Sequence, residues 1–210
     1  MSKKHIITVS GKPGSGKSST ADRVAEMLSY TRFSSGDMVR SILDKRDMTL
    51  AQFNARAESD HHLDEEIDEQ LRDLRRKNDI VIDSRLGFYW IPESFKVYLD
   101  LDMDVASARI FKDAQENVGR AKGAGTASSL GEVAKQVQGR MRNEQRRYKA
   151  MYSVDPYDTR HFDLVVNTSR HSPQTVALTV FDHYQQWLES DTWEQVYSEI
   201  PMGYSFKNEY

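Results

Sequence analysis

The sequence contains no cysteine, which excludes a disulfide scaffold, a thiolate metal site and a cysteine nucleophile. It lacks an apolar run near the roughly 18 residues that a membrane span requires, and the apolar stretch near its start is too short for a signal peptide. Neither sign of charge prevails: 29 Lys and Arg face 32 Asp and Glu, for a formal net charge of -3. That balance argues against bulk electrostatic binding to nucleic acid. We therefore expect a cytoplasmic, soluble protein that is a monomer and contacts no membrane.

Short apolar segments alternate with amphipathic ones along the 210 residues, of which 38% are hydrophobic. Residues 5–10 are β-branched and apolar, which is typical of a strand buried on both faces of a parallel sheet. Further strands are predicted at 32–34, 79–83, 95–100 and 162–167, and helices at 21–28, 36–45, 63–74, 129–148 and 173–189. This order predicts an α/β fold with a doubly wound parallel sheet. We expect one domain over residues 1–190 and a C-terminal tail at 191–210.

A complete P-loop, with the pattern Gly-x-x-x-x-Gly-Lys-Ser, stands between the first strand and its helix. A chance match in a chain of this length is expected about once in 100 such sequences. Its glycines allow backbone amides to surround a phosphate, Lys17 adds charge near the β- and γ-phosphates, and Ser18 offers a hydroxyl to Mg²⁺. The residues expected to bind ATP here are Gly11, Lys12, Pro13, Gly14, Ser15, Gly16, Lys17, Ser18 and Ser19.

Polar residues that follow two other predicted strands are candidates for a second anion site. Open α/β sheets bind ligands at the carboxyl ends of their strands. Asp83 is therefore expected to order the water shell of the metal, and Arg85 to hold an acceptor phosphate through its planar fork. The segment Ser35–Arg40 follows the short strand at 32–34, so Ser35, Asp37 and Arg40 are candidate acceptor contacts. The alternatives are a surface Asp–Arg pair and an ordinary solvated arginine.

An arginine-rich helix is the candidate for a lid over the site. Arg140, Glu144 and Arg147 share one helical face, and Glu144 can hold the two arginines in register. We expect a lid at about 114–150, with a mobile loop of glycine, alanine and serine at 115–131. Basic stripes on helices are also typical of solvated faces or nucleic-acid contacts. Beside a P-loop, we favour stabilisation of the transferring phosphoryl group by Lys17, Arg85, Arg140 and Arg147.

The motifs beyond the P-loop separate several nucleotide-binding classes. A GTPase switch needs Asp-x-x-Gly and Asn-Lys-x-Asp, and neither pattern occurs. The chain is also too short for the insertions of motor ATPases. Small-molecule kinases remain, because they need a second anion site and a closing lid that excludes water. A kinase for another small acceptor, such as UMP or a non-nucleotide, and a P-loop switch without catalysis stay open as alternatives.

Six segments together resemble the short, archaeal-type cytidylate kinases within the nucleoside monophosphate kinase group: GKPGSGKSS, SSGDMVR, VIDSRLGFYW, KVYLDLD, RRYKAMYSVDPYD and FDLVVNTSRHSP. The resemblance covers roughly residues 5–188. It implies a P-loop kinase fold, with a five-stranded parallel sheet flanked by helices and with lid and monophosphate-binding regions. It further implies transfer of the γ-phosphoryl group of ATP to CMP or dCMP.

The same resemblance assigns roles to individual residues. Ser35 and Arg40 correspond to acceptor contacts, and Arg85 to the arginine on the acceptor phosphate. Arg140 and Arg147 fall in the lid helix. Residues 168–170, which end in Arg170, correspond to the loop that borders the adenine. Expected ligands are ATP, Mg²⁺ and a nucleoside monophosphate, with Ser18 and Asp83 at the metal.

Overall fold

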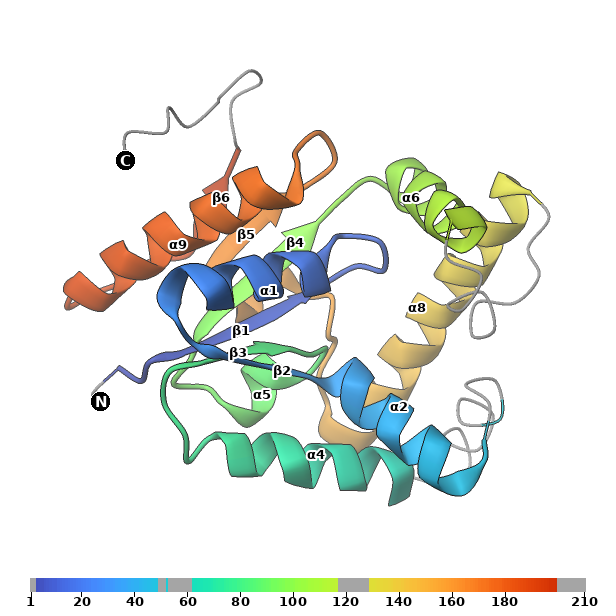
Figure 1. Cartoon of the computed structure of the whole chain (residues 1–210), viewed down its shortest axis with the longest axis horizontal. Coiled ribbons are helices and arrows are strands. Elements are labelled where there is room, and N and C mark those ends of the chain that lie inside the picture. Colours follow the sequence, from blue (N-terminus) through green and yellow to red (C-terminus); the bar gives the residue numbers. More distant parts are fainter. Residues whose placement is uncertain (1–2, 49–51, 53–61, 117–128, 200–210) are drawn as a thin grey trace.

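A computed structural model describes residues 3–48, 52, 62–116 and 129–199 (Figure 1). Its elements in chain order are β1 (Ile6–Gly11), α1 (Lys17–Leu28), β2 (Thr31–Ser34), α2 (Ser35–Arg46), α4 (His62–Leu74), β3 (Ile80–Asp83), α5 (Gly87–Trp90), β4 (Phe95–Asp100), α6 (Met103–Glu116), α8 (Leu130–Tyr152), the 3₁₀ helix η1 (Thr159–His161), β5 (Leu164–Asn167), α9 (Pro173–Glu189) and β6 (Val196–Ser198).

The strands form one parallel sheet in the order β2-β3-β1-β4-β5-β6. The expected α/β architecture is confirmed, but the described sheet has six strands rather than five. The additional strand, β6, comes from the segment predicted as a tail. Two hydrogen bonds to the carbonyl of Asp163 hold it there, from Trp193 Nε1 at 3.1 Å and from the amide of Val196 at 3.0 Å.

The two faces of the sheet are covered by different helices, because successive side chains of a strand point to opposite sides. Ile7 and Val9 of β1 lie in the apolar cluster with α1 and α9, which run side by side on one face (Figure 1). Ile6 lies in the cluster with Ile80 and with residues of α2 and α4. Both faces of the sheet are therefore buried at β1, which explains why apolar residues follow one another along this strand instead of alternating with polar ones.

Side-chain caps set the helix boundaries. The Ser129 side chain accepts a hydrogen bond from the amide of Glu132 at the start of α8, and Ser172 accepts one from the amide of Thr175 at the start of α9. α9 spans the predicted residues 173–189. The expected loop 115–131 is shorter than predicted, because residues 115–116 end α6 and residues 130–131 begin α8. Its residues 117–128 lie outside the described part of the chain.

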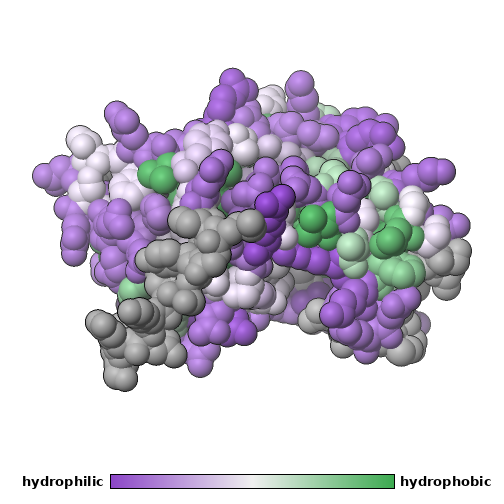
Figure 2. All heavy atoms as spheres, turned by 90° about the horizontal axis from the view of Figure 1, so that it is seen from above, coloured by the Kyte–Doolittle hydropathy of each residue, from purple (hydrophilic) through white to green (hydrophobic). Residues whose placement is uncertain are grey.

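α6 and α8 pack against each other beyond the carboxyl ends of the central strands (Figure 1). α2 follows directly from β2 and lies on the same side of the sheet as α6 and α8 (Figure 1). The face seen in Figure 2 is mostly hydrophilic, with small separate apolar patches among its described residues. In the described ranges, no helix combines the length and apolar character needed to cross a membrane.

Candidate active site

Glycines shape the loop between β1 and α1 because backbone approaches and positive φ angles exclude other residues. A Cβ at Gly11, where φ is +144°, would lie 2.2 Å from the carbonyl oxygen of Leu99 on β4. Gly14 and Gly16 have φ angles of +77° and +85°, and Gly16 is the N-cap of α1. The N-terminus of α1 therefore faces the loop, where its dipole favours an anion.

The remaining loop residues differ in exposure. Pro13 is buried, whereas Ser19 is exposed on the first turn of α1. Ser15 is 2% exposed, and among the described residues its Oγ atom has no hydrogen-bond partner. A buried polar atom without a partner costs about 1–3 kcal/mol, so this hydroxyl fits a loop that is completed by a ligand with acceptor oxygens.

Lys17 begins α1, and its Nζ atom donates to the carbonyl oxygen of Lys12 at 3.0 Å. Burial, with the nearby Arg85 guanidinium, lowers the pKa of Lys17 to about 7, although Asp83 acts in the opposite direction. Arg140 lowers this pKa further. The loop and the arginine helix thus form one positive field, and a bound polyanion would restore the charge of Lys17.

Ser18 and Asp83 supply oxygen atoms suited to Mg²⁺. The Ser18 hydroxyl donates to Oδ2 of Asp83 at 2.6 Å, and Asp83 is 7% exposed at the end of β3. Mg²⁺ is usually held by one or two such groups together with waters and substrate phosphates. This donor set therefore fits the ion expected from the sequence.

Arg85 follows β3 and points toward the loop. Its Nη1 atom donates to the carbonyl oxygen of Gly11 at 3.0 Å, and its Nε atom donates to Oε2 of Glu144 on α8 at 2.8 Å. Arg140, also on α8, donates from Nε to Oε1 of the same carboxylate at 2.9 Å. The Tyr157 hydroxyl donates to it as well. Glu144 therefore joins Arg85 and Arg140. The helical spacing predicted Arg140 and Arg147 as its partners, and this prediction is confirmed for Arg140 only.

The charges in this cluster stabilise one another. Burial opposes the charge of Glu144, but Arg85 and Arg140 outweigh it and hold the pKa of that carboxyl far below its ordinary value. Burial likewise opposes the charge of Arg85, yet Glu144 raises the pKa of Arg85 above its ordinary value. The Arg85 side chain is 13% exposed and that of Arg140 is 55% exposed. Arg140 is thus the more accessible of the two.

Arg147 lies apart from this carboxylate, on the same face of α8. Its Nε atom is 3.1 Å from Oδ2 of Asp64 on α4, and the two side chains are 13% and 6% exposed. Asp64 is absent from the sequence-predicted site. In the sequence, Asp64 is one of several acidic residues in the first half of a predicted helix, and such a run is typical of a solvent-exposed face.

The residues predicted to bind the acceptor lie around β2. The Ser35 hydroxyl donates to the carbonyl oxygen of Asp83 at 3.3 Å. Arg40 is paired with Asp37 and its side chain is 66% exposed. Arg32, which sequence reasoning missed, reaches Asp37 at 2.9 Å and Asp83 at 3.5 Å. A charged side chain in a short predicted strand was the available signal.

Lys12 and Arg170 lie at the edges of the site. The Lys12 Nζ atom pairs with Asp100 at 2.6 Å, so its charge is neutralised at the end of β4. Arg170 is exposed in the loop after β5. Arg109 of α6 holds this loop by donating to the carbonyl oxygen of Thr168 at 2.7 Å. Arg109 is a third residue that the sequence did not indicate, because the contact of α6 with this loop is a tertiary one.

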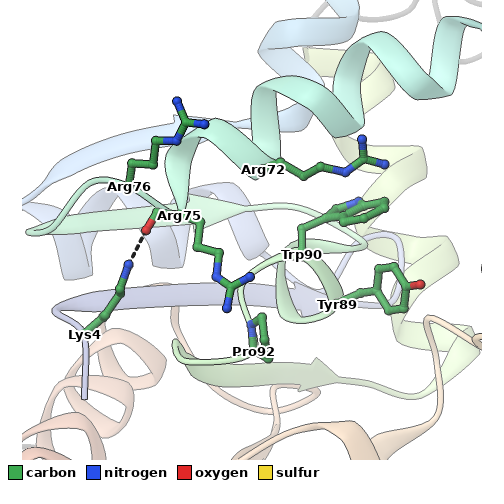
Figure 3. A pocket seen from close by; sticks show the side chains of 7 residues that line it. All are labelled: Lys4, Arg72, Arg75, Arg76, Tyr89, Trp90 and Pro92. Atoms are coloured by element: carbon green, nitrogen blue, oxygen red, sulfur yellow. Dashed lines mark hydrogen bonds between the residues drawn. The ribbon is translucent and has the colours of Figure 1, made fainter. Parts of the chain in front are cut away.

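A hollow of about 780 Å³ lies at the opposite edge of the sheet (Figure 3). Its lining residues are Lys4, Arg72, Arg75, Arg76, Tyr89, Trp90 and Pro92. Lys4 and Pro92 precede β1 and β4, so the hollow adjoins the amino ends of the strands and is separate from the P-loop. Within it, the Arg72 guanidinium lies 4.0 Å from the centre of the Trp90 ring.

Sequence comparison relates this chain to a known family. The model of the cytidylate kinase-like family matches residues 6–170. A cytidylate kinase of Halobacterium salinarum is 36% identical over 180 residues, which cover 84% of this chain and 88% of that protein. A cytidylate kinase of Natronomonas pharaonis is 34% identical over 178 residues, which cover 83% of this chain and 86% of that protein.

Comparison with solved structures supports the fold. A shikimate kinase from Bacteroides thetaiotaomicron superposes with a TM-score of 0.58 at 12% sequence identity, covering 88% of this chain and 98% of that one. At this identity the likeness concerns the arrangement of sheet and helices, and it confirms the predicted α/β fold.

Proposed function

The chain belongs to the cytidylate kinase-like family and is a nucleoside monophosphate kinase, and on that premise we propose that it transfers the γ-phosphoryl group of ATP to CMP and dCMP with Mg²⁺ bound. The P-loop holds the donor phosphates, with Lys17 beside the γ-phosphate. Arg85 holds the acceptor phosphate opposite, and Arg140 lies beside the transferring group. Residues 168–170 border the adenine, and the region from Ser35 to Arg40 lines the acceptor side.

The observation that carries this proposal is the meeting of two cationic groups at the end of β1. Lys17 lies in the loop, and the pair Arg85 and Arg140 faces it from β3 and α8, joined by Glu144. A site for one nucleotide has no need of this second group. Two polyanions bound end to end do need it, because their phosphates repel each other in a low dielectric.

Catalysis in this arrangement is positioning and charge neutralisation. Arg85 presents its fork to the acceptor phosphate so that an oxygen of that phosphate attacks the γ-phosphorus in line. Lys17 and Arg140 stabilise the negative charge on the transferring group. Bound Mg²⁺ would neutralise charge on the donor phosphates. Closure of α8 over the site would exclude water as a competing acceptor.

An acceptor screen tests the proposed reaction. With ATP and Mg²⁺, ADP formation is measured for CMP, dCMP, UMP, AMP and a sugar phosphate at equal concentrations. CMP and dCMP are expected to be the best acceptors, by about tenfold or more in kcat/KM, since one hydrogen-bonded contact to the base contributes about 1–3 kcal/mol. A preference for UMP or for a non-nucleotide would overturn the assignment to cytidylate.

Substitution of Arg85 distinguishes the proposed kinase activity from the alternative that the protein is a nucleotide switch without catalysis. Arg85→Lys keeps a positive charge beside Glu144 but removes the planar fork, so kcat/KM for CMP is expected to fall about a hundredfold. ATP affinity, measured by titration calorimetry, should change little. Arg76→Lys, at an exposed position distant from the P-loop, is the matched control. An unchanged rate in R85K would contradict the assigned role, and absence of transfer in the wild type would favour the switch.

A further inference from the structure

The hollow at the amino ends of the strands (Figure 3) combines cationic and ring-bearing side chains. Of the described residues that line it, four are cationic, three carry a ring and none is acidic: Lys4, Arg72, Arg75, Arg76, Tyr89, Trp90 and Pro92. Its volume of about 780 Å³ lies within the range of small-molecule sites, about 300–1,000 Å³. Because the P-loop lies at the other ends of the strands, the proposed reaction uses none of these side chains.

Two of the four cations form no ion pair with a described residue. The Arg72 guanidinium lies over the Trp90 ring, and Nζ of Lys4 donates to the carbonyl oxygen of Arg75. A guanidinium placed over a ring keeps its five N–H groups around its own edge. The ammonium group of Lys4 has three donors, of which this carbonyl uses one. Both side chains therefore keep donors and charge for an anion.

The other two cations are neutralised to different extents. Arg75 donates from Nε to Oε1 of Glu93 at 2.9 Å, so its charge is compensated within the protein. Arg76 lies 3.7 Å from Asp73, and these two side chains are 86% and 74% exposed. Exposed ion pairs of this kind contribute little to stability. Arg76 is therefore a third cation that is available to a ligand.

Trp90 is fixed in place before any ligand arrives. Its Nε1 atom donates to Oδ1 of the buried Asp68 at 2.8 Å, and Asp68 also accepts from the Tyr152 hydroxyl. The rings of Tyr89 and Tyr152 meet Trp90 edge to face, with centres 4.7 and 5.4 Å away. Tyr89 itself is 38% exposed. The hollow thus offers an open ring on a rigid support, which lowers the entropy lost on binding.

We propose that this hollow binds a free nucleotide as a site separate from the P-loop. The base packs against Tyr89 and Pro92, since planar rings pack well on aromatic side chains. The phosphates bind Arg72, Arg76 and Lys4. A nucleic-acid strand would need a basic groove that continues over several nucleotides, whereas this hollow has the volume of one small ligand.

Titration calorimetry with the β,γ-imido analogue of ATP tests this site. With Mg²⁺ and saturating CMP present, the wild type is expected to bind two equivalents, one at the P-loop and one in the hollow. Arg72→Gln removes the charge and should weaken the second equivalent about tenfold or more, while the first equivalent and kcat stay unchanged. Arg23→Gln, at an exposed position of α1 on the opposite face of the sheet, is the matched control and should bind both.

Two further variants test the two halves of the ligand. Lys4→Gln should also weaken the second equivalent, whereas Tyr89→Ala should weaken the analogue but leave binding of inorganic tripolyphosphate unchanged. Thermal unfolding shows whether each variant is folded. One equivalent in the wild type, or a second one that R72Q and K4Q both retain, would overturn the proposal. Tripolyphosphate that binds as tightly as the analogue would overturn recognition of the base.

A single-stranded oligonucleotide is the remaining probe. If it bound more tightly than the analogue and this binding were lost in R72Q, a nucleic acid would replace the free nucleotide as the ligand, and the proposal would be wrong. The inference does not depend on the proposed function. Absence of the first equivalent would count against that function, and absence of the second would count against the hollow.

Discussion

Lys17→Met is expected to reduce phosphoryl transfer by about a thousandfold while making the ligand-free protein more stable. The loss of activity follows because, in the proposed reaction, the charge of the P-loop residue Lys17 acts on the transferring group. The gain in stability follows because burial and Arg85 lower the pKa of Lys17 to about 7 in the folded state. The folded protein therefore holds the protonated amine less favourably than the unfolded chain does.

The gain depends on pH in a definite direction. Above the ordinary lysine pKa of about 10.5, the amine is neutral in both states and its titration contributes nothing. As pH falls from there toward 7, the unfolded chain binds the proton first and the folded protein loses stability. The difference between K17M and the wild type should therefore be largest below pH 7, at about 1 to 3 kcal/mol, and should shrink as pH rises.

Urea unfolding at pH 6.5 and pH 9 measures this difference, and a coupled ADP assay measures the activity. Lys45→Met, at an exposed position on α2, is the control and should change neither quantity. Lys17→Arg should also be inactive, because a guanidinium does not reproduce a compact ammonium group. A K17M protein that is less stable than the wild type at pH 6.5 would contradict the electrostatic account.

Local sequence predicted the elements whose chemistry is itself local. The strand, loop and helix at residues 5–28 follow from periodicity and glycine spacing, and the Ser172 cap fixes the start of α9. Asp83 and Arg85 were found because the ends of parallel strands meet at one edge of a sheet. In each case the relevant partners lie within a few residues or follow from a general rule of topology.

The residues that sequence reasoning missed depend on contacts between distant segments. Arg32 forms ion pairs with residues of α1 and α2 and with Asp83. Arg109 donates a hydrogen bond to the loop after β5. Asp64 looks like part of a solvated acidic face until α8 brings Arg147 to it. No periodicity encodes these pairings, because they arise only when the helices pack.

The strand β6 was also missed because it depends on contacts between distant segments. Residues 196–198 are too few to show a strand period, and their pairing with β5 depends on the position of the sheet edge. Trp193 packs against the cluster beneath α9, so this segment extends the apolar core as well as the sheet. The indole hydrogen bond to Asp163 then sets where the strand begins.

Glu144→Gln is expected to lower kcat about a hundredfold and to destabilise the protein by about 3 kcal/mol, because it removes the charge that neutralises a buried arginine. Glu144 binds both arginines through their Nε atoms. A guanidinium carries five N–H groups, so each arginine keeps donors for a phosphate after this contact. The glutamine retains the shape but holds two guanidiniums weakly, so they lose their alignment toward Lys17.

The pH dependence distinguishes this role from a packing defect. Arg85 and Arg140 overcome the effect of burial and hold the pKa of Glu144 below its ordinary value, so its stabilisation is present above the unfolded-state pKa and is lost as pH falls. The stability gap between wild type and E144Q, measured by urea unfolding, should be constant above about pH 5 and narrow in acid. Glu69→Gln, at an exposed position, is the control. A gap that persists undiminished at low pH would show that shape rather than charge holds the arginines.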